Sequence, residues 1–197
     1  MARNSRPPAF GGRYAGSVAV VTGASAGLGA QLSRDLARAG ATVVGLARSE
    51  DRLALLSTEL QDDSPKSGTV VCDVADTAAL REALDQVVAT HGPIDLLVNN
   101  AAQDPGVRLV DIGEQDFRHI FNVNFFAPVA ATLHVMPSMV ERGRGTVVMV
   151  SSDMPELMGV CHRIVVFSKD RIVGELQRSE FNQERILSLA YQEYVRS

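Results

Sequence analysis

The sequence predicts an α/β fold built on a doubly wound parallel sheet with helices on both faces. Five short segments are apolar at nearly every position rather than at alternate ones: 18–21, 42–46, 69–72, 94–98 and 146–150. Such runs are typical of strands buried on both faces, as in parallel sheets. Segments with helical spacing separate them, and parallel neighbours require crossover helices of this kind.

The order of elements follows from local signals. Strand 18–21 is followed by a glycine-rich turn and a helix over 29–39, which Gly40 ends as a C-terminal cap would. Strand 42–46 leads into a second helix over 51–60, where three leucines share one face: Leu53, Leu56 and Leu60. Helices over 77–90 and 114–140 then alternate with the last three strands.

The pattern changes after Ser152, because fourteen of the sixteen glycines precede that residue. Runs 164–167 and 171–174 flank a Ser-Lys-Asp turn and predict a β-hairpin. Ser179 is positioned to cap a final helix whose apolar face holds Ile186, Leu187 and residues 189–190. The sheet is therefore expected to be truncated after its fifth strand. We expect a dinucleotide-binding domain over 1–152, preceded by a short disordered tail, and an appendage over 153–197.

Composition excludes several classes of protein. The 197 residues carry a net charge of −4, which gives no electrostatic footprint for nucleic acid or an anionic membrane. We expect no bilayer-crossing segment and no secretory signal. Cys72 and Cys161 are far apart in the sequence, which argues against a disulfide framework or a metal site. Two reduced thiols fit the cytoplasm.

A phosphate-binding turn is predicted directly after the first strand. The segment reads TGASAGLG from Thr22, and its GxxxGxG spacing places glycines at Gly23, Gly27 and Gly29, with Ser25 and Leu28 between them. Glycines let the backbone turn sharply and approach a pyrophosphate, which then sits on a helix N-terminus. The alternative is a tight strand–helix turn without a ligand.

Arg48 stands nineteen residues after Gly29, at the end of the second strand. An acidic residue in this place favours NAD, whereas an arginine accommodates the extra phosphate of NADP. We therefore expect NADP, with NAD as the second choice. The alternative is a solvated arginine at a strand end.

Residues 12–152 resemble the short-chain dehydrogenase/reductase family, whose fold is a Rossmann sheet. The family's TGxxxGxG begins at Thr22, its acid after the third strand is Asp73, and its Asn-Asn-Ala-Gly appears as Asn-Asn-Ala-Ala from Asn99. The resemblance implies that Asp73 holds the adenine amino group beside the Val74 backbone. It also implies that Asn99 braces the sheet and that Asn100 and Ala101 lie at the cofactor, with Ala101 facing the ribose.

Asn124 matches the family's helix asparagine. An α-helix would bond its carbonyl to the N–H of residue 128, but Pro128 has none, so we expect a free carbonyl and a kink. In the family this carbonyl holds a water of the proton relay. The alternative is a proline kink without a catalytic purpose.

The family's catalytic pattern breaks after Ser152, which matches the serine that bonds the substrate oxygen. The resemblance requires a tyrosine thirteen residues later and a lysine four residues after that. Position 165 is Val165, although Lys169 is present. A valine cannot donate or accept a proton, so the resemblance implies an NAD(P)-dependent oxidoreductase for an alcohol or carbonyl substrate that is impaired at this step. A small-molecule substrate and a homodimer are the partners that it implies.

Residues 151–190 instead resemble the C-terminal end of the ATPase subunits of sugar-type ABC transporters. The segment SSDMPEL from Ser151 and the two runs of the expected hairpin carry this likeness. On this interpretation Lys169 is a turn residue and two gene pieces meet near the Ser-Ser pair. The alternative function is an NADP-binding pseudoenzyme or a non-catalytic fusion fragment. An ATPase is disfavoured, because the chain has no ATP-type phosphate loop.

Overall fold

The computed structural model describes residues 13–104, 106, 111–169 and 171–195. The chain divides into two compact units, Met1–Val150 and Ser151–Ser197. The boundary falls two residues before the one expected from the sequence. The tail predicted at the N-terminus lies almost entirely outside the described residues.

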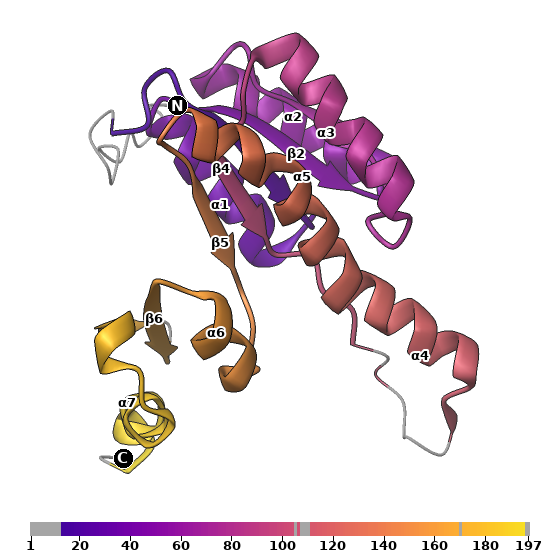
Figure 1. The fold of residues 1–197 in the computed structure, drawn as a ribbon. Coiled ribbons are helices and arrows are strands. Elements are labelled where there is room, and N and C mark those ends of the chain that lie inside the picture. Colours follow the sequence, from indigo (N-terminus) through magenta and orange to yellow (C-terminus); the bar gives the residue numbers. More distant parts are fainter. Residues whose placement is uncertain (1–12, 105, 107–110, 170, 196–197) are drawn as a thin grey trace, which may run out of the picture. The chain divides into compact units, whose positions relative to one another are not determined.

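The first unit is the predicted parallel sheet (Figure 1). Its strand order is β3-β2-β1-β4-β5, and each neighbouring pair is parallel. The five strands are β1 (Val18–Thr22), β2 (Thr42–Ala47), β3 (Gly68–Val71), β4 (Leu96–Asn99) and β5 (Thr146–Met149). The order reverses between β1 and β4, which is where open α/β sheets bind ligands. The predicted fold class is confirmed.

Helices cover both faces of this sheet and create two cores. The four helices packed on it are α1 (Gly27–Arg38), α2 (Glu50–Asp63), α3 (Thr77–His91) and α5 (Ala127–Glu141). Val20 and Leu46 contribute to the core under α3 and α5, whereas their neighbours Val21 and Ala47 contribute to the core under α1 and α2. Alternate strand residues thus reach opposite faces, which explains why the strand sequences are apolar throughout.

The long predicted helix over 114–140 is continuous but not uniform. It consists of α4 (Glu114–Phe121), a π-helical turn η2 (Asn122–Phe126) and α5. The N–H of Ala127 donates to the carbonyl of Asn122, which is the five-residue spacing of a π turn. Pro128 is accommodated by this wider turn. The helix Glu114–Glu141 is also long and apolar enough to cross a membrane by length and composition, which the sequence analysis did not anticipate.

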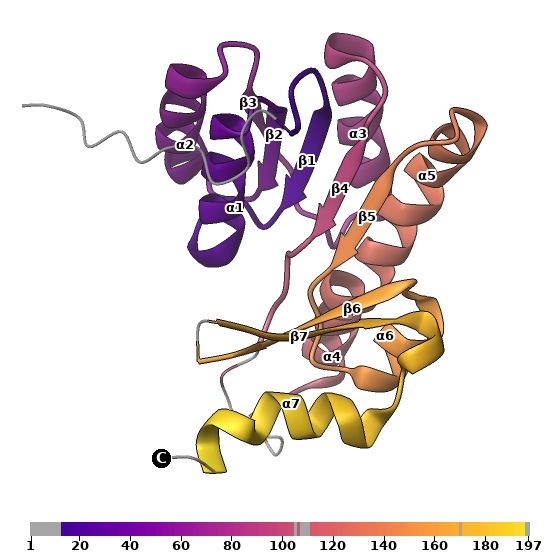
Figure 2. The same ribbon diagram turned by 90° about the vertical axis from the view of Figure 1, so that its left-hand side faces the viewer.

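The second unit contains the predicted hairpin and final helix (Figure 2). Strands β6 (Arg163–Ser168) and β7 (Arg171–Gln177) are antiparallel. The helix α7 (Gln183–Val195) contacts β6 and contributes Ile186 to a small core with Ile164, Val166 and Leu176.

Two local features of the second unit differ from the sequence expectations. A helix α6 (Met154–Val160) precedes the hairpin, and the Asp153 side chain caps it by accepting from the N–H of Glu156 at 2.9 Å. Ser179 does not begin α7, because it lies in the 3-10 turn η3 (Arg178–Glu180). Asn182 takes that role and accepts from the N–H of Arg185 at 3.0 Å. Ser and Asn are both favourable N-cap residues, so the path of the chain after β7 determined which of the two caps α7.

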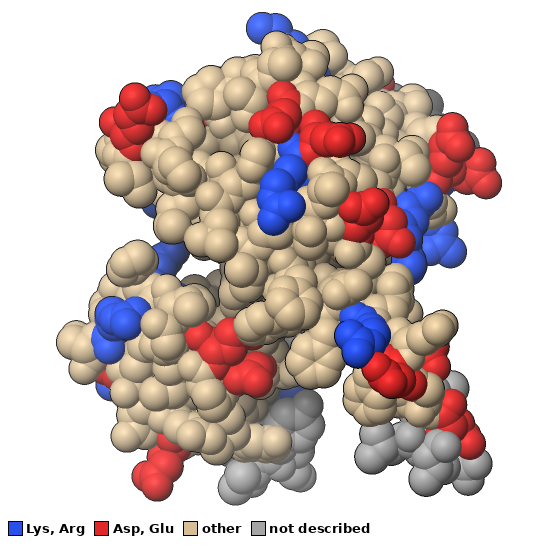
Figure 3. All heavy atoms as spheres, turned by 45° about the vertical axis from the view of Figure 1, so that its right-hand side comes forward, with Lys and Arg blue, Asp and Glu red and all other residues tan. Residues whose placement is uncertain are grey.

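Charged side chains of both signs are interspersed on the face drawn in Figure 3. Within the first unit, Arg142 pairs with Asp95 at 2.6 Å, and Arg34 pairs with Glu59 at 2.7 Å. No continuous basic patch collects on this face among the residues that the structure describes.

Candidate functional site

The glycine turn after β1 is built so tightly that side chains at two positions would collide with backbone. Gly23 has a positive φ of 67°, and a Cβ there would lie 2.8 Å from the Cα of Ala101. A Cβ at Gly29 would lie 2.4 Å from the carbonyl oxygen of Gly23 and 2.5 Å from Nδ2 of Asn100. These two glycines are therefore required by packing against the end of β4.

Thr22 and Asn100 join the ends of β1 and β4. The Thr22 hydroxyl accepts from the backbone N–H groups of Asn100 and Ala101, both at 3.0 Å, and donates to the carbonyl of Val98 at 3.3 Å. In return, Nδ2 of Asn100 donates to the carbonyls of Thr22 at 3.0 Å and Gly23 at 3.4 Å. Thr22 is only 4% exposed. In the sequence Thr22 is only the first residue of the glycine motif, and no local pattern indicates this role.

The N-terminus of α1 is open above this turn. Ala26 precedes the helix and has no side-chain cap, so no side chain occupies the N–H groups of the first turn. Gly27 has a φ of 53°, nothing lies within 4 Å of where its Cβ would be, and Leu28 is 53% exposed. Ser25, half-buried, lies within the same turn. Free N–H groups at a helix N-terminus are suited to a phosphate.

Arg48 and Asp73 lie just beyond the carboxyl ends of β2 and β3. Arg48 is exposed and forms no hydrogen bond or ion pair to the described part of the chain. Asp73 accepts from the N–H of Ala75 at 3.0 Å, which fixes the turn that carries it. Val74 beside it is buried. All of these residues follow strand ends at the same edge of the sheet as the glycine turn.

Asn99 and Asn124 connect the strand ends to the long helix. Asn99 is 4% exposed, and its Nδ2 donates to the Thr132 hydroxyl on α5 at 3.1 Å. Asn124, in η2, accepts from the N–H of Gln103 at 2.8 Å and donates to the carbonyl of Gln103 at 2.9 Å. The sequence pattern indicated the Asn124 carbonyl but not this side-chain contact, because Gln103 is distant in sequence and belongs to no motif.

The remaining predicted catalytic residues belong to the second unit. Ser152 is exposed and precedes Asp153, the residue that caps α6. Lys169 is in the hairpin turn with a positive φ of 45°, and Val165 pairs with Glu175 in the strands. Positions 165 and 169 therefore do not lie one turn apart on a helix. The catalytic assignment of Ser152 and Lys169 stays a prediction.

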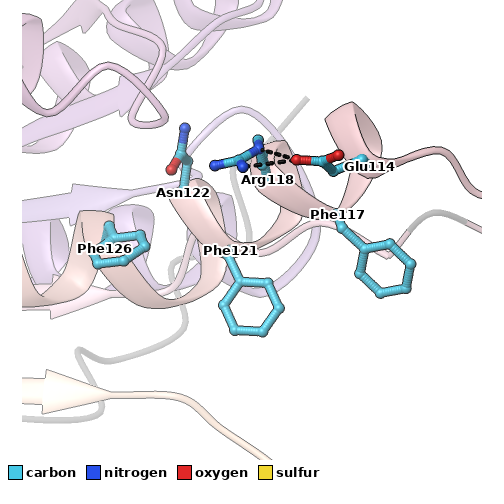
Figure 4. Close-up of a pocket in the computed structure, with 6 residues that line it drawn as sticks. All are labelled: Glu114, Phe117, Arg118, Phe121, Asn122 and Phe126. Carbon is cyan, nitrogen blue, oxygen red and sulfur yellow. Dashed lines mark hydrogen bonds and ion pairs between the residues drawn. The ribbon is translucent and has the colours of Figure 1, made fainter.

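A shallow hollow of about 430 Å³ runs along α4 and η2 (Figure 4). Phe117, Phe121 and Phe126 point to one side of the helix, while Arg118 and Glu114 are joined at 2.7 Å away from them. Phe121 and Phe126 are each at least half exposed. None of the residues lining the hollow belongs to the predicted cofactor set.

The known proteins that this chain resembles match mainly its first unit. The family model for short chain dehydrogenases matches residues 17–165. A short chain dehydrogenase of Pseudocercospora fijiensis is 38% identical over 148 residues, which cover 74% of this chain and 48% of the relative. Ketoacyl reductase HetN of a Nostoc species is 35% identical and is matched over 48% of its length. The chain thus spans about half the length of these curated relatives.

Solved structures give the same result. A metagenomic short-chain oxidoreductase in complex with NADP has a TM-score of 0.67 and 33% identity, over 71% of this chain and 64% of that one. L-sorbose reductase from Gluconobacter frateurii, complexed with NADPH and L-sorbose, has a TM-score of 0.66 and 28% identity, over 71% of this chain and 54% of the reductase. The match over 17–165, supported by these relatives and by the geometry at the strand ends, shows that the chain belongs to the short-chain dehydrogenase family.

Proposed function

We propose that the first unit binds NADP(H) at the carboxyl ends of its strands. The observation that carries this proposal is the uncapped N-terminus of α1 above the glycine turn that Thr22 and Asn100 lock to β4. The pyrophosphate would take the N–H groups of the first helical turn, where the helix dipole also favours negative charge. Gly23, Ser25, Gly27, Leu28 and Gly29 form this part of the site.

The adenosine half would lie over β2 and β3. Arg48 is exposed and unpaired among the described residues, so its guanidinium is available to a 2′-phosphate. Asp73 and the Val74 backbone would hold the adenine. Related structures with bound NADP or NADPH support this choice over NAD. The opposite half of the dinucleotide would then lie beside Asn100 and Ala101.

The activity we propose is hydride transfer with an alcohol or carbonyl substrate, at a low rate. NADP(H), when bound, supplies or accepts the hydride. Ser152 would hydrogen-bond the substrate oxygen, the Asn124 carbonyl would hold a water, and Lys169 would position the nicotinamide ribose. Val165 has no group that exchanges a proton with the substrate oxygen. Protonation by a positioned side chain contributes typically 10²–10⁴-fold, so turnover should be slow by that order.

A second candidate is an NADP-binding protein without turnover. The observation in its favour is that Val165 lies in β6, paired with Glu175, rather than in a helix that carries a lysine one turn later. The second unit would then be the C-terminal end of a sugar-type ABC transporter ATPase subunit joined to a dehydrogenase fragment. It carries no nucleotide chemistry. We place either form in the cytoplasm, on the basis of its two free thiols.

Calorimetry with NADPH and NADH, followed by NADPH oxidation with a panel of carbonyl compounds, separates these candidates. The Ser152→Ala variant is the matched control for turnover. Binding with turnover above that of the control supports the oxidoreductase. Binding with turnover equal to the control supports the second candidate. A protein that binds neither NADPH nor NADH contradicts both.

The homodimer that the family resemblance implies has a candidate surface on α4 and η2. Phe117, Phe121 and Phe126 form one exposed apolar stripe there (Figure 4). A second copy that covered this stripe would remove large aromatic area from water. Light scattering of the purified chain and of Phe121→Glu tests the assignment. We expect a dimer for the parent chain and a monomer for the variant.

A further inference from the structure

Gln103 connects the loop after β4 to the long helix that begins at Glu114. Its backbone N–H and carbonyl are both bonded to the Asn124 side chain, at 2.8 and 2.9 Å. Its own side chain oxygen lies 2.9 Å from Nε2 of His119 on α4. Because the amide oxygen is an acceptor, the bond places the ring hydrogen on Nε2. The loop after β4 is therefore held to the long helix at two points, through its backbone and through a side chain.

The π turn contributes to this arrangement. Residues five apart on a regular α-helix point about 140° away from each other. His119 and Asn124 are five apart, yet both bond to Gln103. The hydrogen bond from Ala127 to Asn122 spans five residues and overlaps the end of the stretch from His119 to Asn124. Its wider turn reduces the angle between these two side chains around the helix axis. The π turn therefore allows Gln103 to contact side chains from two successive turns of the helix, His119 and Asn124.

The position of Gln103 indicates what the contact serves, on the basis of the function proposed above. With the pyrophosphate on α1 and the adenosine half over β2 and β3, the nicotinamide half must extend to the other side of β1, over β4. Gln103 follows Asn100 and Ala101 on the loop that leaves β4. Any movement of this loop would change the support beneath the nicotinamide ring but not the support beneath the adenine.

We propose that Gln103 is a positioning residue for the nicotinamide half of NADP(H), with His119 holding its side chain in place. Gln103 acts through the loop and through Asn124 and exchanges no proton with the substrate. Loss of the bond between Gln103 and His119 removes one of the two points that hold the loop, so the nicotinamide ring is held less firmly, although the backbone bonds to Asn124 remain. The adenine half keeps all of its contacts.

The test uses the full chain with two ligands. NADPH reports on both halves of the site through its affinity and through the fluorescence of its nicotinamide ring. Adenosine 2′,5′-bisphosphate lacks the nicotinamide and reports on the adenine half alone. Gln103→Met removes the acceptor at nearly constant length, His119→Leu removes the donor, and Gln103→Glu keeps an acceptor for His119. Gln115→Met is the matched control, because Gln115 is exposed on α4 and its side chain has no hydrogen bond or ion pair among the described residues.

For Gln103→Met and His119→Leu we expect about two- to tenfold weaker NADPH binding, the range of one lost hydrogen bond. The emission of bound NADPH should change, and affinity for the bisphosphate should stay within twofold. The double variant should be no worse than either single variant, because both remove the same bond. Gln103→Glu and Gln115→Met should behave like the parent chain.

Unchanged NADPH affinity and emission in both variants would overturn the proposal. An equal loss for both ligands would also overturn it, since that pattern indicates general destabilisation. Failure of the proposed function is distinguishable from either result, because the parent chain would then bind neither ligand. Additive losses in the double variant would separate His119 from Gln103 and contradict the assigned contact.

Discussion

A single buried hydroxyl, that of Thr22, serves as acceptor for two backbone N–H groups at the end of β4 and as donor to a third group. Arg48 is the opposite kind of residue, exposed and without a partner among the described residues. Removing the Thr22 hydroxyl leaves partly buried backbone groups unsatisfied in the protein itself, whereas removing the Arg48 guanidinium matters only when a ligand is bound. Substitution of Thr22 should therefore change the stability of the protein, and substitution of Arg48 should change its affinity for a ligand.

Arg48→Asp should weaken NADPH binding at least about tenfold, because a hydrogen bond to a charged group contributes about 1.5–3 kcal/mol and each 1.4 kcal/mol is one decade. NADH should be affected less. Calorimetry with both coenzymes measures the ratio. Arg52→Asp makes the same charge change on the exposed part of α2 and serves as the control. An unchanged NADPH-to-NADH ratio in Arg48→Asp would show that Arg48 is an ordinary surface residue.

Thr22→Val should lower the free energy of unfolding by about 1–3 kcal/mol, since it leaves two partly buried N–H groups without their acceptor at nearly constant volume. Thr22→Ser keeps the hydroxyl and should lose about 1 kcal/mol or less, the scale of one methyl group. Urea unfolding followed by circular dichroism compares the two variants. Equal losses in both would mean that the hydroxyl bonds contribute little.

At the scale of elements, two segments took their form from context rather than from local sequence. Pro128 predicted a kink in the long helix, and the structure accommodates this proline by a π turn in a continuous helix. Ser179 and Asn182 are both suitable caps, but the 3-10 turn that ends β7 uses Ser179 and leaves Asn182 at the start of α7. The capping preference of a side chain indicates where a helix can begin. The path of the chain after the preceding strand then decides which of these positions is used.

Asn182→Ala should destabilise the second unit by about 1 kcal/mol, the typical value for losing a helix cap. Ser179→Ala should change its stability by less than about 0.5 kcal/mol, as for a surface substitution. Hydrogen exchange of the first-turn amides of α7 measures both. Should Ser179→Ala prove the more damaging of the two, the helix would begin where the sequence alone placed it.

At the scale of the whole molecule, the two units each carry one cysteine, Cys72 in the first and Cys161 in the second. Burial raises the pKa of the Cys72 thiol, and the carboxylates of Asp73 and Asp76 raise that pKa further. Burial also raises the pKa of Cys161, with a further contribution from Glu156. Both thiols are therefore mostly protonated at neutral pH and should react slowly.

Stability should also depend on pH in a defined direction. A thiol whose pKa is raised by folding loses its proton more easily in the unfolded chain. Its stabilising contribution is fully present below the pKa of the unfolded thiol and is lost as pH rises through the folded pKa. Unfolding of the first unit in alkaline buffers should therefore become easier in the parent chain than in Cys72→Ala, relative to their values at neutral pH. A parallel pH dependence in both chains would contradict this.

Thiol labelling tests the independence of the two units. NADPH at one hundred times its dissociation constant should slow labelling of Cys72 about a hundredfold, because it stabilises the closed form by about 2.7 kcal/mol. Cys161 should react at an unchanged rate if the second unit takes no part in cofactor binding, and more slowly if Lys169 contacts the nicotinamide ribose. Mass spectrometry of the labelled peptides resolves the two sites. Equal protection of both thiols would mean that the units open together, and protection of neither would contradict cofactor binding.

The sequence determined the parallel sheet, the glycine turn and the hairpin, because each depends on patterns within a few residues. Runs such as 18–21 are apolar at every position only when both faces of a strand are covered, and Gly23 and Gly29 mark a turn that tolerates no Cβ. The coenzyme and catalytic assignments made from those motifs remain proposals. The resemblance of residues 151–190 to transporter ATPase subunits also stays a prediction.

Only the tertiary structure decided which remote groups meet. It paired the Thr22 hydroxyl with the end of β4, some 78 residues away, and joined Asn124 and His119 through Gln103. The physical reason is that hydrogen bonds between distant segments leave no periodic trace in the sequence, whereas burial of a strand or helix face is repeated along it.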